Sequence, residues 1–134
     1  MITITIPFRT VSESNMREHH MAKARRVKWQ RNVVGLAVRP RVKGMAHPLP
    51  CSVLMTRVAP RPLDDDNLRG ALKATRDQIA AELGVDDRDP RVVWRYAQRR
   101  GGKGVYAVEI VFTPVSLAED AETHPGATSC EGGP

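Results

Sequence analysis

The chain opens on a strict alternation of apolar and polar positions. Ile2, Ile4 and Ile6 are separated by threonines, and a period of two places all three isoleucines on one face of an extended strand. A second alternation runs through residues 51–58, where Cys51, Val53 and Met55 are interleaved with other side chains, and two prolines follow it. Both segments are therefore predicted to be β-strands.

Two more apolar segments lie further along the chain, at residues 92–98 and 105–113. The residues between them, 99–104, read Arg-Arg-Gly-Gly-Lys-Gly. A short glycine-rich link between two strands is typical of a β-hairpin. We therefore expect these two strands to pair with each other.

Two other segments have apolar positions every three or four residues, which is the helical period. The clearer one covers residues 68–83, and Gly84 follows where a helix C-cap belongs. Its apolar face consists of Leu68, Leu72, Thr75, Ile79 and Leu83. The other covers residues 16–38, and Gly35 with Arg39-Pro40 is expected to end it. The order β-α-β-α-β-β predicts an α/β (α+β) fold: one domain with a mixed β-sheet and two main helices.

Charge divides the chain into two parts. Residues 1–115 carry all 21 Lys and Arg but only 11 of the 15 acidic residues, a net charge of +10. Residues 116–134 contain no Lys or Arg and are rich in small, polar and acidic residues. We expect a folded basic domain over 1–115 and a disordered acidic tail over 116–134. A net charge of +10 favours nucleic acid or an anionic membrane surface as the partner.

Membrane insertion and export are not indicated. No apolar run approaches the length that spans a bilayer, and the N-terminus lacks the order of charged and apolar residues typical of a signal peptide. The two cysteines, Cys51 and Cys130, form no CxxC motif. The sequence therefore predicts a cytoplasmic protein with unpaired thiols.

Seven aspartates lie between Pro62 and Val93, and six of them form two groups, at 64–66 and 86–89. Neighbouring carboxylates repel each other unless a cation lies between them, and Mg²⁺ prefers such oxygen ligands. In an extended segment, Asp64 and Asp66 would face the same way. The alternative is that these aspartates cap the helix and form turns. Two groups flanking one helix in a basic protein favour the metal site.

The same region carries a family resemblance. Leu63-Asp64-Asp65-Asp66-Asn67-Leu68, then a lysine-bearing helix with Asp77, then Leu83-Gly84-Val85-Asp86-Asp87 before an apolar strand, resembles the RusA-type Holliday-junction resolvases common in phages and prophages. The opening strand with Ser14-Asn15 is similar to the family's N-terminal strand and loop. The resemblance covers most of residues 1–113 and is specific over 63–93.

The resemblance implies a homodimeric, Mg²⁺-dependent endodeoxyribonuclease that nicks opposing strands of a four-way junction in DNA recombination or repair. Asp64, Asp66 and Asp87 match the family's catalytic, metal-binding carboxylates. The family's lysine position is occupied by Gly70, so Lys73, or Arg69 as its substitute, is expected to supply the positive charge. The N-terminal loop lacks aromatic residues, which departs from the family pattern.

Basic residues outside the acidic groups are expected to contact DNA phosphates. They are Lys23, Arg25, Arg26, Lys28, Arg31, Arg69, Arg99, Arg100 and Lys103. Two other functions stay open. One is a non-catalytic DNA-binding protein whose carboxylates are caps, and the other is a nuclease with a broader range of branched substrates.

Overall fold

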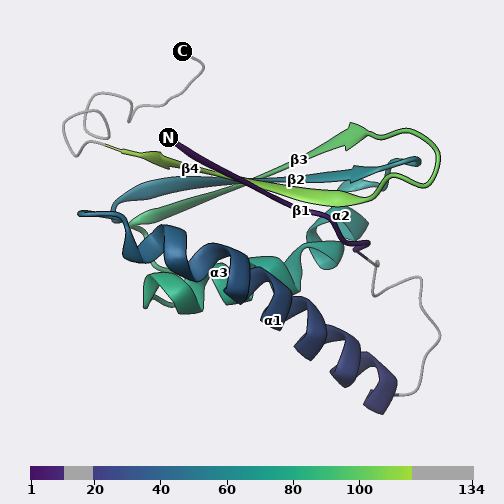
Figure 1. Cartoon of the computed structure of the whole chain (residues 1–134), viewed down its shortest axis with the longest axis horizontal. Helices are drawn as coiled ribbons and strands as arrows, with labels where there is room; N and C mark the ends of the chain where they lie inside the picture. Colours follow the sequence, from purple (N-terminus) through teal and green to yellow (C-terminus); the bar gives the residue numbers. More distant parts are fainter. Residues whose placement is uncertain (11–19, 116–134) are drawn as a thin grey trace.

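The computed structural model describes residues 1–10 and 20–115 (Figure 1). The elements are β1 (Ile2–Ile6), α1 (His20–Lys43), β2 (Cys51–Ala59), α2 (Asp65–Ala71), α3 (Lys73–Leu83), β3 (Val92–Arg100) and β4 (Ala107–Pro114). The predicted α+β class and order are confirmed, except that Leu72, with φ −100° and ψ 4°, divides the second helix into α2 and α3. The expected acidic tail and the Ser14-Asn15 loop lie outside the described residues.

The sheet has the strand order β1-β4-β2-β3. β4 pairs antiparallel with both β1 and β2, whereas β3 pairs parallel with β2, from Cys51↔Val92 to Ala59↔Arg100. The predicted β3–β4 hairpin is wrong, because β2 lies between these strands. The helical crossover through α2 and α3 carries the chain back to the end of the sheet where β2 begins, so β3 runs parallel to β2.

The link after β3 passes the end of β2, where the Gly101 backbone N–H donates to the Ala59 carbonyl at 2.9 Å. A Cβ at Gly101 would lie 3.0 Å from the Val105 carbonyl oxygen and 3.1 Å from Val58. Glycine is therefore needed at this position because two backbone segments approach closely, and not because the chain makes a hairpin turn.

Helix α1 continues beyond both residues that were expected to end it. Gly35 is buried within the helix, where a Cβ would lie 3.0 Å from Gln78 and 3.1 Å from Glu82 of α3. Pro40 lies inside the last turn, where its missing N–H removes one helical bond without stopping the helix. Gly35 is thus a point of close helix packing, and its signal as a helix end was misleading.

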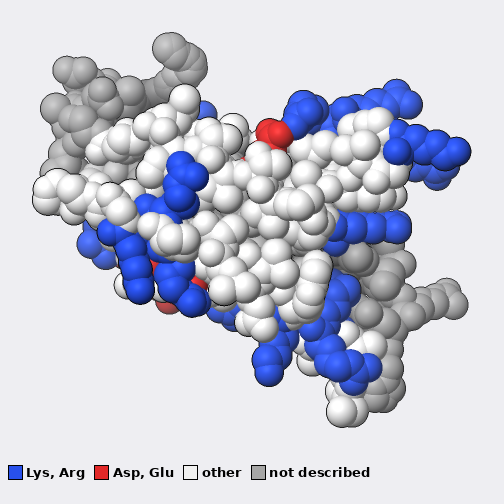
Figure 2. All heavy atoms as spheres, viewed as in Figure 1, with Lys and Arg blue, Asp and Glu red and all other residues white. Residues whose placement is uncertain are grey.

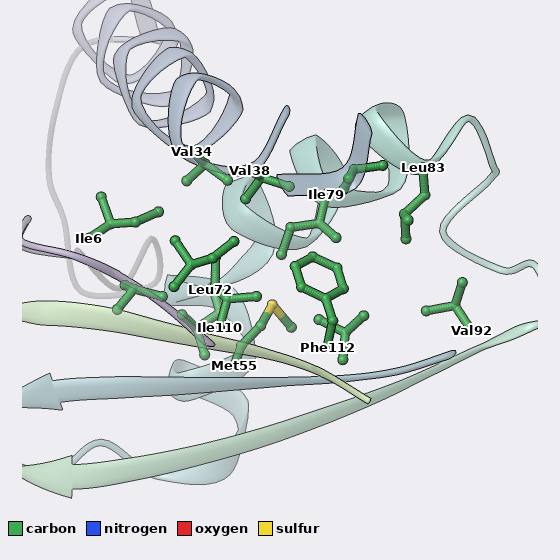
Figure 3. Close-up of a cluster of buried hydrophobic side chains, with 14 of the residues drawn as sticks. Ile6, Val34, Val38, Met55, Leu72, Ile79, Leu83, Val92, Ile110 and Phe112 are labelled. Atoms are coloured by element: carbon green, nitrogen blue, oxygen red, sulfur yellow. The ribbon is translucent and has the colours of Figure 1, made fainter. Parts of the chain in front are cut away.

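All three helices lie on one face of the sheet (Figure 1). The core forms between these layers (Figure 3), and its largest fully buried side chains include Phe112, Met55, Leu72 and Ile79. The apolar face predicted for residues 68–83 is buried at every one of its five positions. Burial of this stripe against the sheet adds to the strong helix formers of α3, which is rich in Ala, Lys, Arg, Gln and Glu.

Strand register arranges the helix-facing side chains in rows. One row runs Ile4, Ile110, Met55 and Tyr96 across the four strands. The next row towards the C-terminal end of β2 runs Ile6, Val108, Arg57 and Gln98. The helix-facing side of the sheet is therefore apolar for most of its length and becomes polar at this end of β2 and β3.

Candidate active site along β3

The first acidic segment begins helix α2. Asp64 is the N-cap, and its Oδ1 accepts the Asn67 backbone N–H at 2.9 Å. Asp65 and Asp66 are exposed in the first turn, where negative charge is favourable to the helix dipole. The premise that Asp64 and Asp66 lie in an extended segment is wrong, because the chain becomes helical at Asp65.

This segment is fixed to β3 through Gln98. The Gln98 side-chain amide accepts from the Leu63 backbone N–H at 2.9 Å and donates to the Leu63 carbonyl at 2.7 Å. Both bonds act on the residue immediately before Asp64. The position of the first acidic segment is therefore set by a side chain on the edge strand.

The second acidic segment is a turn between α3 and β3. Asp86 accepts the Arg88 backbone N–H at 2.9 Å, and this bond is the largest cause of its lowered pKa. Asp89 pairs with the Arg91 guanidinium at 2.7 Å and accepts its backbone N–H, which together lower the pKa of Asp89 to about 2. Both aspartates therefore have local structural partners.

Asp87 is held by Arg76 of α3, which the sequence interpretation did not single out. Arg76 Nη2 donates to the Asp87 carbonyl at 2.8 Å, and Nε lies 3.8 Å from Asp87 Oδ2. Arg76 Nη1 donates to the Tyr96 hydroxyl at 2.8 Å, and its guanidinium lies 4.9 Å from the Trp94 ring centroid. Trp94 Nε1 also donates to the Asp87 carbonyl at 3.1 Å. No spacing rule in the sequence indicates this arrangement.

The two acidic segments thus both contact the helix-facing side of β3, one at Trp94 and the other at Gln98. These positions are four residues apart, or about 13 Å along a strand. Arg69 of α2 lies between them, 5.7 Å above the Tyr96 ring centroid. Within residues 1–10 and 20–115, no group of three or more His, Cys, Asp or Glu is placed to hold a metal ion.

Lys73, the expected catalytic lysine, is the first residue of α3 and its side chain is 67 % exposed. Its Nζ lies 3.6 Å from Asp77 Oδ2, one helical turn away. A Cβ at Gly70 would meet nothing within 4 Å. Both positions are therefore open to a bound molecule.

The basic residues predicted to contact DNA fall in two areas apart from Arg69. In α1, an open groove of about 620 Å³ is lined by Lys23, Lys28 and Arg31 together with Gln78 of α3. Arg31 Nε donates to Gln78 at 2.9 Å, whereas Arg25 is exposed and Arg26 is half-buried.

The second basic area is the end of β3 and the link after it. Arg99, Arg100 and Lys103 are exposed there, and Arg99 forms an ion pair with Glu109. Figure 2 shows Lys and Arg side chains gathered at this end of the sheet and along the lower edge formed by the helices. The basic surface therefore extends over more than one element.

None of the helices in the described parts of the chain is long and apolar enough to cross a membrane. A comparison of the chain with protein-family models finds no match, and a search of the curated proteins finds none either.

Proposed function

We propose that this chain is a cytoplasmic, Mg²⁺-dependent endodeoxyribonuclease of the RusA type that resolves four-way DNA junctions by paired nicks as a homodimer. The observation that carries the proposal is the placement of both acidic segments against the helix-facing side of β3, through Leu63–Gln98 and Asp87–Trp94 bonds. A two-fold dimer would present two such pairs of acidic segments to the two equivalent phosphates of a junction.

The charge of the surrounding surface supports a polyanionic substrate. The groove on α1 and the exposed arginines at the end of β3 are suited to phosphate contacts that are independent of base sequence. Arg69 and Lys73 add positive charge close to the first acidic segment. Together they would hold a DNA strand while the carboxylates face its backbone.

Asp64, Asp66 and Asp87 would hold Mg²⁺, which supplies an activated water and stabilises the charge that develops on the phosphate. Carboxylate oxygens match the preference of this ion. Because these residues are not gathered into one three-ligand group, ion binding has to bring the two segments closer. Arg76 and Gln98 would be positioning residues, since each holds one segment on β3.

A non-catalytic DNA-binding protein is the second candidate. It is favoured by the local bonds of Asp64, Asp86 and Asp89, each of which accepts a backbone N–H two or three residues away. On this alternative the carboxylates stabilise a helix start and a turn, and the basic surface alone accounts for binding.

Cleavage of a synthetic four-way junction, with Mg²⁺ and with EDTA, tests the proposal against a linear duplex of the same sequence. We expect paired, symmetric nicks near the crossover that require Mg²⁺. Asp66→Asn should abolish cleavage and retain junction binding, whereas Asp65→Asn, the same charge change in the same turn, should cut normally. Junction binding without cleavage would establish the second candidate, and cleavage by Asp66→Asn would refute the metal assignment.

Two further measurements complete the test. Competition between the junction and the linear duplex at moderate salt separates a resolvase from a nuclease of broader range, because only the former should prefer the junction. Sedimentation of the purified chain should give the mass of a dimer. A monomer that still makes paired nicks would contradict the two-fold arrangement.

A further inference from the structure

Arg57 occupies a core position of the sheet. It follows Cys51, Val53 and Met55 on the helix-facing side of β2, and its register partners are Val108 and Gln98. The residue is only 9 % exposed. An arginine residue with so little exposed surface is rare unless an anion compensates its charge.

The two hydrogen bonds of Arg57 go to uncharged acceptors. Nε donates to Thr10 Oγ1 at 3.2 Å, and Nη1 donates to the Arg61 carbonyl at 2.8 Å. Within the described parts of the chain, no carboxylate lies within ion-pair distance of Arg57 and Nη2 donates no hydrogen bond. Among the described residues Nη2 has no hydrogen-bond partner, but it is not fully buried. Solvent therefore reaches this part of the guanidinium.

The surroundings of Arg57 add positive rather than negative charge. Arg9 lies 4.8 Å from the centroid of the Tyr106 ring, and both side chains act electrostatically on Arg57. Burial is the largest cause that lowers the pKa of Arg57, and Arg9 lowers it further, while Tyr106 raises it. Arg61 is exposed nearby. Two guanidinium groups, those of Arg57 and Arg9, thus lie close enough to repel each other at the end of β2.

We propose that Arg57, with Arg9 beside it, binds a phosphate group through its forked donors. A tetrahedral dianion or phosphodiester would accept from Nη2 and compensate a charge that has no counter-ion in the described structure. A neutral ligand would leave that charge uncompensated. The chemistry therefore selects an oxyanion.

The site lies beside the first acidic segment, because Gln98, the register partner of Arg57, holds Leu63. The source of the phosphate rests on the proposed function: a DNA backbone phosphate bound here would fix the strand next to Asp64. Free phosphate would use the same donors. The two sources are separated by the probes below.

The first probe is inorganic phosphate, added to the full chain in EDTA against chloride at equal ionic strength. We expect the Tm of the wild type to rise with phosphate concentration, because a ligand that binds only the folded state stabilises it. Arg57→Gln should lose this rise. Arg41→Gln, an exposed arginine at the far end of α1, is the matched control and should keep it.

The second probe is a fluorescent four-way junction, whose binding is measured by anisotropy in EDTA over a range of salt. Arg57→Gln should weaken binding about tenfold, as for loss of one charged hydrogen-bonded contact. It should also reduce the slope of log K against log salt by about 0.9, the value for one phosphate. A response to inorganic phosphate with an unchanged DNA slope would identify free phosphate as the ligand.

Two variants keep the test decisive if Arg57→Gln does not fold. Arg57→Lys retains the charge but loses the forked donors, so it should bind phosphate weakly. Arg9→Gln changes an exposed residue and should reduce phosphate binding by a smaller factor. If folded variants respond to phosphate and to the junction as the wild type does, the proposal is overturned. Because no arm requires cleavage, failure of the nuclease proposal would be seen separately.

Discussion

Arg76 and Asp87 are joined through both backbone and side chain. Nη2 of Arg76 donates to the Asp87 carbonyl at 2.8 Å, while its Nε lies 3.8 Å from the Asp87 carboxylate. Arg76 Nε is also buried without a hydrogen-bond partner. One arginine on α3 therefore fixes the turn that carries the second acidic segment.

Replacing Arg76 by glutamine should lower the free energy of unfolding by about 1–3 kcal/mol, since the Asp87 carbonyl and the Tyr96 hydroxyl lose a charged donor. Urea denaturation of the purified variant measures this loss. Tyr96→Phe, which removes only one of the bonds, should cost about 1 kcal/mol. Equal stability of Arg76→Gln and the wild type would show that the turn does not depend on this residue.

The Asp89–Arg91 pair should give a stability that depends on pH. The folded-state pKa of Asp89 lies at about 2, below its ordinary value of 3.8. The pair therefore stabilises the fold above pH 3.8, and this contribution is lost as the pH falls through about 2. Asp89→Asn should have a slightly lower Tm than the wild type at pH 6. The two Tm values should converge towards pH 2, and a constant difference would contradict the assignment.

Leu72 lies where α2 meets α3, and it is fully buried. Leu72→Ala should cost about 2–5 kcal/mol, because it removes apolar contacts and leaves a cavity. Leu36→Ala is the control, since Leu36 is 72 % exposed, and it should change stability by less than about 0.5 kcal/mol. Chemical denaturation of both variants measures the two losses, and equal losses would show that the segment between α2 and α3 does not belong to the core.

Two glycines should respond to alanine in opposite directions. Gly84 has φ +74° and an open surrounding, so Gly84→Ala should cost about 1–2 kcal/mol through backbone strain alone. Gly70 lies in α2, and a Cβ there meets nothing within 4 Å. Gly70→Ala should therefore gain about 0.5–1 kcal/mol. A gain at Gly84, measured by thermal unfolding, would show that its left-handed conformation is not required.

Local patterns predicted the features that depend on neighbouring residues. The alternation at Ile2–Ile6 and the C-cap at Gly84 are confirmed, because side-chain period and backbone freedom are local properties. The pairing of β3 was not accessible in this way. Residues 99–104 resemble a hairpin turn, and only the position of β2 decides that the strands are not neighbours.

The candidate site was predicted in part. The positions of the acidic groups at both ends of the α2–α3 crossover followed from the sequence, and so did the capping alternative that Asp64 shows. Arg76 was missed because its partners, Asp87 and Tyr96, are 11 and 20 residues away and meet it only after folding. Arg57 carried a signal that was not used, since it interrupts an apolar face at an inward position of a strand.

The break at Leu72 has a consequence for the spacing of the acidic segments. An unbroken helix from Asp65 to Leu83 would be about 28 Å long, yet the β3 residues that hold the two segments are only about 13 Å apart along the strand. The bend and the returning turn reconcile these lengths. One residue inserted into α3 would turn all later side chains by about 100°. The number of residues in the crossover, and not only their identity, therefore determines how close the two groups of aspartates lie, on which the proposed nuclease activity depends.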